Sequence, residues 1–248
     1  GGIGSAANFL EIDSSNSDGA VSNGLLNAQA QNSIFITETA GDLRLQLVAV
    51  DEGDASLATL AGSIVDGNDD LDADGNAGTF TDADGRVRDA VNVMADNIAL
   101  DANGGSIGEA DDDLAIDSGV HGGVHTKGQG WLFAEANGGV FLTEVNDELN
   151  VLAATALGGQ LRLTVPDTSA ADTENLVLLA GGTARVQESG DRTVTVSDIS
   201  ATTTVALWVG DNVTIMSDDA SRILAKDGIT IRGDTRRQAK IDGGESDD

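Results

Sequence analysis

The chain has 248 residues, enough to bury a large core, and 40% of them are hydrophobic, mostly Ala, Val, Leu and Ile. Its 13 basic and 42 acidic residues give a formal charge of −29, which disfavours nucleic acid and anionic membrane surfaces as partners. Cysteine is absent, which excludes disulfides and thiolate metal sites. No apolar run is long enough to span a membrane as a helix, so we expect no membrane insertion. Because the chain opens on a repeat motif, we expect it to be a piece of a longer protein.

Short apolar segments follow one another from the N-terminus at a spacing of about 9 to 10 residues, with Gly, Asn or Asp at each junction. They occupy residues 25–30, 34–39, 43–50 and 55–60. The run Leu43-Arg44-Leu45-Gln46-Leu47 alternates apolar and polar residues, which is typical of a strand with one face buried.

An acidic insert follows at residues 66–90 and is the strongest chemical signal in the chain. Alternating Asp70, Asp72 and Asp74 before Gly75 match the first half of an oxygen-rich calcium loop, in which carboxylates converge on one cation. Thr81 stands at the twelfth position, with Asp82 next, so the pattern favours a looser site than an EF-hand. The alternative is a solvated acidic turn. The candidate calcium ligands are Asp66, Asn68, Asp70, Asp72, Asp74, Asn76, Asp82, Asp84 and Asp89.

The first segments recur about 105 residues later. Leu10-Glu11-Ile12-Asp13 matches Leu114-Ala115-Ile116-Asp117, and Ile34-Phe35-Ile36-Thr37-Glu38 matches Val140-Phe141-Leu142-Thr143-Glu144. The second copy continues through residues 131–136, 149–153 and 161–165, where Trp131 takes the place of Leu25 as a core or surface apolar residue. Tandem copying is typical of a unit that extends a surface, whereas a catalytic pocket is usually made once.

Further strands are predicted at residues 193–196, 205–209, 212–215 and 228–231, and no segment has a helical period. We therefore predict an all-β, right-handed parallel β-solenoid with coils of about 20 residues. An antiparallel β-sandwich array is the alternative, since its strands have similar spacing. The predicted organisation is one elongated domain over 1–248: repeat one at 1–65, the acidic insert at 66–90, repeat two at 91–180 and further β-coils at 181–248.

Several of these motifs resemble a known family: Gly104-Gly105-Ser106-Ile107-Gly108, the Leu-x-Ile-Asp pair, Ile34 to Glu38, and the runs Gly210-Asp211-Asn212-Val213-Thr214-Ile215 and Gly228-Ile229-Thr230-Ile231-Arg232-Gly233-Asp234. They are similar to the giant β-strand-repeat surface proteins of Gram-negative bacteria, the filamentous-haemagglutinin-like adhesins. The resemblance implies an exported, elongated β-helix with adhesive or structural duty, and it carries over no catalytic residue. The acidic insert departs from this pattern, because the second copy has no equivalent.

Other charged motifs are interpreted as surface features. Asp111-Asp112-Asp113, Asp218-Asp219 and Asp247-Asp248 are expected to be solvated turns. His121 and His125 are expected in a flexible loop, because the glycines between them disfavour a zinc-binding helix. Arg232-Gly233-Asp234 is read as a strand end that matches an integrin tripeptide by coincidence. The basic cluster could dock an acidic face of a neighbouring module or be a solvated end; it comprises Arg232, Arg236, Arg237 and Lys240.

No nucleophile elbow, phosphate loop or dinucleotide motif occurs in the chain. We therefore expect a non-enzymatic structural or adhesive segment of a secreted or cell-surface bacterial protein, stabilised by calcium. Its expected partners are neighbouring repeats, copies of the same protein and cell-surface glycans. Two alternatives remain open. One is a carbohydrate-active β-helix, a polysaccharide lyase or hydrolase, because carboxylates abound. The other is an ice- or mineral-binding face built from the threonines at 193–195 and 202–204.

Overall fold

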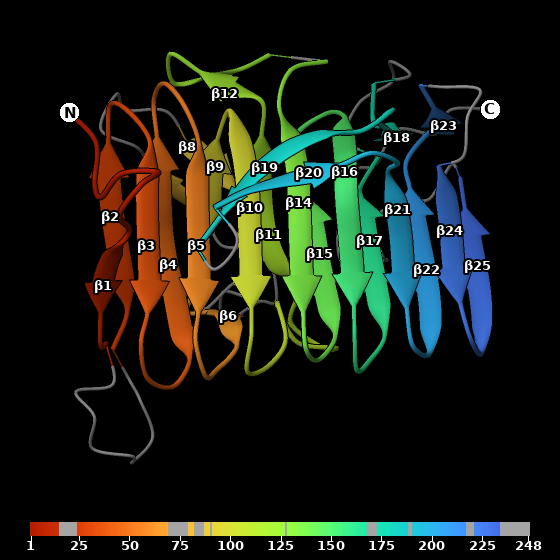
Figure 1. The fold of residues 1–248 in the computed structure, drawn as a ribbon. Helices are drawn as coiled ribbons and strands as arrows, with labels where there is room; N and C mark the ends of the chain where they lie inside the picture. The colour runs from red at the N-terminus through yellow and green to blue at the C-terminus, as the bar shows by residue number, and fades with distance from the viewer. Residues whose placement is uncertain are drawn as a thin grey trace.

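The computed structural model describes residues 1–14, 24–68, 79–81, 87–89, 91–126, 128–167, 173–187, 190–216 and 221–233. Over these residues the protein is all-β, and two large sheets of parallel strands run side by side from the N-terminal to the C-terminal coil (Figure 1). We call them the front and the back sheet. The parallel β-solenoid is thus confirmed, and the antiparallel sandwich alternative is wrong, because consecutive strands in both sheets pair in parallel.

In the coils without an insert, strands alternate between the sheets as the chain winds. The front sheet contains β1 (Leu10–Ile12), β3 (Ile34–Glu38), β5 (Ala55–Thr59), β10 (Asn97–Ala102), β14 (Trp131–Ala136), β16 (Leu149–Ala156), β18 (Leu176–Leu178), β21 (Asp198–Ala201), β23 (Val213–Ile215) and β24 (Arg222–Ala225). The back sheet contains β2 (Leu26–Ala30), β4 (Leu43–Val50), β6 (Ile64–Asp66), β9 (Val93–Ala95), β11 (Leu114–Ser118), β15 (Val140–Glu144), β17 (Leu161–Val165), β22 (Thr204–Val209) and β25 (Gly228–Arg232). Three antiparallel pairs stand apart from the sheets: β7 (Thr79–Thr81) with β8 (Val87–Asp89), β12 (Val120–His121) with β13 (Val124–His125), and β19 (Gly182–Val186) with β20 (Gly190–Val194).

The core consists of rows of aliphatic side chains that run from coil to coil. Ile36 of β3 pairs with Leu57 of β5, which pairs in turn with Leu100 of β10, and all three are almost fully buried. Such rows follow from alternation, because in-register parallel pairing places every second side chain of each strand inward. In β4, Leu43 and Leu45 point into this core, while Gln46 is exposed.

Plain coils have nearly the predicted length. Ile34 pairs with Ala55 and Val140 with Leu161, a step of 21 residues in each case. Longer steps occur where a coil carries an insert, as between Ala55 and Ile98, which the acidic insert between β6 and β9 separates. The boundaries proposed for the repeats and the insert remain predictions. The segment at 193–196 differs from the expectation, because Thr193 and Val194 end hairpin strand β20 and form no coil strand.

The two sequence copies fold alike in detail. Leu10 pairs with Ile36 in the first copy, as Leu114 pairs with Leu142 in the second. A register shift in the β2–β4 pair, between Leu26 and Asn27, recurs in the β14–β16 pair between Leu132 and Phe133. Because both copies have this register shift, they share backbone geometry as well as strand positions.

The copies nevertheless lie on opposite faces of the solenoid. The first copy places β1, β3 and β5 in the front sheet, whereas β11, β15 and β17 of the second copy lie in the back sheet. The chain therefore makes an odd number of half-coils between equivalent strands. As a result, a surface feature that the two copies share is presented on both sides of the molecule.

The β19–β20 hairpin crosses the outer face of the front sheet over several coils (Figure 1). Its Ala184 and Val186 are buried against outward-facing Phe133 and Leu152. The Ser56 hydroxyl donates a 2.7 Å hydrogen bond to the Arg185 carbonyl oxygen. The β19–β20 hairpin thus adds a second apolar layer to the outer face of the front sheet.

Shortening a core row should destabilise the whole solenoid. Leu57→Ala removes a side chain with no exposed surface and is expected to lower the free energy of unfolding by about 2 to 5 kcal/mol. The control Gln31→Ala changes an exposed corner residue and should stay within about 0.5 kcal/mol of the parent. Denaturant unfolding followed by circular dichroism measures both. Equal midpoints for the two variants would contradict the continuous core.

Candidate functional site

The structure describes only part of the predicted calcium site. Asp66 ends β6 and is buried; its Oδ1 accepts hydrogen bonds from the Asn68 amide at 2.7 Å and from Asn92 Nδ2 at 2.6 Å. Asn68 donates its side-chain amide to the Gln46 carbonyl. Asp89 belongs to β8, whose backbone alone is described. The remaining candidates lie outside the described residues: Asp70, Asp72, Asp74, Asn76, Asp82 and Asp84.

The root of the insert is electrostatically unfavourable. Asp66 Oδ2 is buried without a hydrogen-bond partner. Burial, together with the charges of Asp66 and neighbouring acids, raises the pKa of Asp112 to about 6. Within the described residues, no group of three or more His, Asp or Glu side chains is arranged to hold a metal ion. Calcium binding therefore stays a prediction.

A buried glutamate ends one strand in each copy. Glu38 and Glu144 take the next inward position after two core residues of β3 and β15, and both are fully buried. The Ser14 hydroxyl donates to Glu38 at 2.6 Å, as the Ser118 hydroxyl donates to Glu144 at 2.8 Å. Each serine also donates its backbone amide to the same carboxyl group. We call this arrangement the serine–glutamate corner.

The match between the two copies predicts the strands that carry these residues, but it does not predict the contact between the serine and the glutamate. The signal was present, since a serine follows Leu-x-Ile-Asp in both copies and a glutamate ends both partner strands. Hydroxyl and amide donors offset the cost of burying a carboxyl group. The corner therefore has a structural role in both copies.

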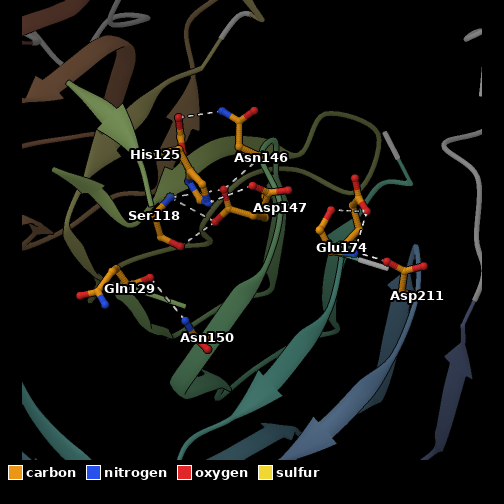
Figure 2. Close-up of polar contacts among 11 residues, drawn as sticks. Ser118, His125, Gln129, Asn146, Asp147, Asn150, Glu174 and Asp211 are labelled. Atoms are coloured by element: carbon orange, nitrogen blue, oxygen red, sulfur yellow. Dashed lines mark hydrogen bonds and ion pairs between the residues drawn. The ribbon is translucent and has the colours of Figure 1, made fainter. Parts of the chain in front are cut away.

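The second copy adds an imidazole to its corner, on the side away from the core (Figure 2). His125 of β13 places Nδ1 2.9 Å from Asp117 Oδ1 and Nε2 3.7 Å from Asp147 Oδ2. Asn146 Nδ2 donates to the other Asp117 oxygen at 2.8 Å. His125 is half-buried in the β12–β13 hairpin, so the expected flexible loop is here a paired hairpin whose histidine contacts carboxylates.

Two carboxyl groups share this corner. Burial raises the pKa of Glu144 well above its usual value, and the charge of Asp117 raises it further, while the bonds from Ser118 and Asn146 oppose the shift. Asp117 itself is buried and bonded to His125 and Asn146. Glu144 is therefore the group that holds a proton more readily than a free carboxylic acid.

The corner does not form a serine nucleophile. The Ser118 hydroxyl is fully buried and donates to Glu144, whereas His125 Nδ1 lies against Asp117. A nucleophilic serine needs an imidazole nitrogen at its own hydroxyl. This corner therefore binds protons and holds strands together, and it does not resemble a hydrolase site.

The back sheet carries a row of aromatic and guanidinium groups across four successive coils. The Arg162 guanidinium carbon lies 5.2 Å from the Phe141 ring centre and 5.1 Å from that of Trp208, and Arg232 lies 5.8 Å from Trp208. Arg162 also pairs with Asp113, which accepts a bond from Thr143 at 3.0 Å. Asp113 is thus part of an ion pair, and its predicted role as a solvated turn residue is wrong. We call this row the cation–π ladder.

The other charged motifs are only partly described. Arg232 ends β25 and lies on the ladder, Gly233 follows the strand, and Asp234 is outside the described residues. The motifs and basic residues that also lie outside the described residues are Asp218-Asp219, Asp247-Asp248, Arg236, Arg237 and Lys240. Trp131 is half-buried and packs against the layer under the β19–β20 hairpin, in agreement with its interpretation as an apolar packing residue.

Replacing the buried acid should remove part of the pH dependence of stability. The pKa of Glu144 is raised in the folded protein, so its stabilising effect is complete at low pH and is lost as pH rises through the folded pKa. Glu144→Gln keeps an acceptor for Ser118 and should flatten the fall of melting temperature on the alkaline side. Glu144→Ala leaves Ser118 unpaired over a cavity and should cost about 2 to 4 kcal/mol at neutral pH. Thermal melts between pH 5 and pH 9 give both results; parallel profiles for the parent and Glu144→Gln would contradict the assignment.

Comparison with known proteins returns no relative. No protein-family model matches this chain, and neither a curated protein nor a solved structure matches it. Among the residues that the structure describes, no helix is long and apolar enough to span a membrane. The similarity to filamentous-haemagglutinin-like adhesins therefore rests on strand and turn motifs alone.

Proposed function

We propose that this chain is a non-enzymatic structural or adhesive segment of a secreted or cell-surface bacterial repeat protein. The observation that supports this role most strongly is the duplicated unit, which repeats its register, its β-bulge and its buried serine–glutamate corner. Both copies share one core, which extends from Ala28 to Val209. A unit that stacks on its own copy lengthens a rod without creating a new pocket.

The cation–π ladder is the surface that best suits contact with cell-surface glycans. Trp208 is half-buried, and Arg232 beyond it is exposed. The guanidinium groups of Arg162 and Arg232 lie over the Trp208 ring, and a guanidinium can bind hydroxyl or carboxylate oxygens of a sugar. Copies of the same protein or neighbouring repeats are the other proposed partners. The described end of the chain supports this, because inward-facing Ile229 and Ile231 of the last coil remain about half exposed.

A binding and cleavage assay tests the proposed role. The protein is incubated with neutral and acidic polysaccharides, and the products and the bound fraction are measured. We expect no cleavage, and we expect Trp208→Ala to weaken any glycan binding, because it removes the ring on which the Arg162 and Arg232 guanidinium groups lie. The matched control is Trp131→Ala on the other sheet. Reproducible cleavage that is lost on replacing one Asp or Glu would establish the carbohydrate-active alternative.

We also propose that calcium stabilises the segment. The support is the density of Asp in the insert, together with the buried Asp66 oxygen that has no hydrogen-bond partner. A divalent cation would offset the repulsion among these carboxylates, and calcium accepts irregular oxygen cages that magnesium does not. The proposed ligands are those named from the sequence, with Asp66 at the root of the insert.

Melting temperature should rise with calcium and fall with a chelator. At one hundred times the dissociation constant, calcium would add about 2.7 kcal/mol of stability. Replacing Asp70, Asp72 and Asp74 together by Asn should abolish the response, and Asp66→Asn should weaken it while keeping the Oδ1 hydrogen bonds. Asp227→Asn, on the last coil, is the control. Identical melts in calcium and chelator, with no heat of binding by calorimetry, would show that the insert is a solvated acidic loop.

A further inference from the structure

The β12–β13 hairpin covers an apolar patch on the outer face of the back sheet. Its Val120 is fully buried and packs with Met94, Ala115 and Val145, which belong to or directly follow three back-sheet strands. At the tip, the Gly122 amide donates a 2.6 Å hydrogen bond to the Asp51 carbonyl oxygen. The hairpin therefore spans from the corner of β11 to the turn after β4.

One side of this hairpin is fastened through His125. Its two ring nitrogens face Asp117 at 2.9 Å and Asp147 at 3.7 Å. Nε2 is buried, and no hydrogen bond of normal length satisfies it. A neutral imidazole has one N–H and can serve one carboxylate, whereas an imidazolium has two and carries the opposite charge. Because both ring nitrogens face carboxylates, the geometry fits a protonated His125 better than a neutral one.

We propose that His125 makes the β12–β13 hairpin a pH-dependent clasp. As the imidazolium, it ties the hairpin to β11 through Asp117 and to the turn after β15 through Asp147. On deprotonation the tie weakens, and the hairpin opens more often over Met94, Ala115 and Val145. The clasp is independent of any adhesive or calcium-dependent role.

The charged groups around His125 all favour its protonated form. Asp117 of β11 and Asp147 of the β15–β16 turn face the ring, and Glu144 of β15 faces Asp117. Burial lowers the pKa of His125, but the hydrogen bond to Asp117 and the charges of Asp117 and Asp147 outweigh it, so the pKa lies above its ordinary value. Stabilisation by a group with a raised pKa is complete at low pH and is lost as pH rises through the folded pKa. The clasp therefore closes on the acid side and loosens on the alkaline side.

The first copy provides an internal comparison. Asn146 and Asp147 occupy the positions of Ala40 and Gly41, which carry no charge. Gly41 has a φ of +78°, and Asp147 is the one described non-glycine residue with a positive φ, at +48°. A left-handed backbone suits glycine better than aspartate. The second copy thus tolerates a less favourable residue at a position where its carboxylate reaches His125.

The titration of His125 tests the clasp directly. Its imidazole Cε1–H signal is followed by NMR, with the histidine of a short unstructured peptide as the reference. Hydrogen exchange of residues 118–126, corrected for its intrinsic pH dependence, reports opening of the hairpin. We expect His125 to titrate at higher pH than the reference histidine, and exchange of the hairpin to increase at least threefold once pH passes the His125 midpoint.

Two substitutions isolate the ion pair. Asp147→Gly restores the residue of the first copy, and Asp147→Asn removes the charge at nearly constant size. Both should shift the His125 midpoint to lower pH and reduce the pH step in exchange. Asp227→Asn, at an exposed position of the last coil, is the control that leaves Asn146 and both carboxylates in place. Repeating the exchange measurement in Glu144→Gln separates the hairpin from the titration of that acid. A His125 midpoint no higher than that of the reference histidine, or an exchange profile unchanged in both Asp147 variants, would overturn the proposal.

Discussion

In-register parallel stacking is the constraint on which the rest of the structure depends. Each strand is hydrogen-bonded to its equivalent one coil away, so side chains of like orientation form rows, such as Ile36, Leu57 and Leu100. An extra residue inside a strand would turn every following side chain to the opposite face. Inserted segments therefore leave the coils between strands. The acidic insert lies between β6 and β9, which both pair with β4, and the β19–β20 hairpin lies between β18 and β21, which both pair with β16. The β12–β13 hairpin follows the end of β11.

Polar side chains that would disrupt the apolar rows of the core lie at the ends of the strands. Glu38 and Glu144 occupy inward positions at the ends of their strands, where serine amides and hydroxyls can reach them. Because these bonds lie inside the coil, the outer side of the corner is free to vary between copies. The second copy uses that freedom to place Asp147 against His125, whereas the first copy has Gly41 there.

Each outer face carries a hairpin, but the two faces cover their aromatic rings by different means. The front sheet is covered by a hairpin, so outward Phe133 is buried between the sheet and Arg192, whose guanidinium lies 5.1 Å from the ring centre. The back sheet instead covers Phe141 with Arg162 from the next coil. In both cases a guanidinium shields an aromatic ring from water and keeps its own charge partly solvated. An acidic chain thus places its few arginines where stacking stabilises them.

The sequence by itself determined the all-β class, most strand positions and the existence of two copies, because alternation and turn residues are local properties. Segment 43–50 and the strand Val140–Glu144 were predicted with their structural bounds. Parallel pairing required the structure, since sandwich and solenoid strands have the same spacing and differ only in their hydrogen-bonded partners. The opposite placement of the copies depends on how many half-coils separate them, which the insert obscures in the sequence. The contacts of Ser118 with Glu144 and of His125 with Asp147 join residues 26 and 22 positions apart, and only the coil register brings them within bonding distance.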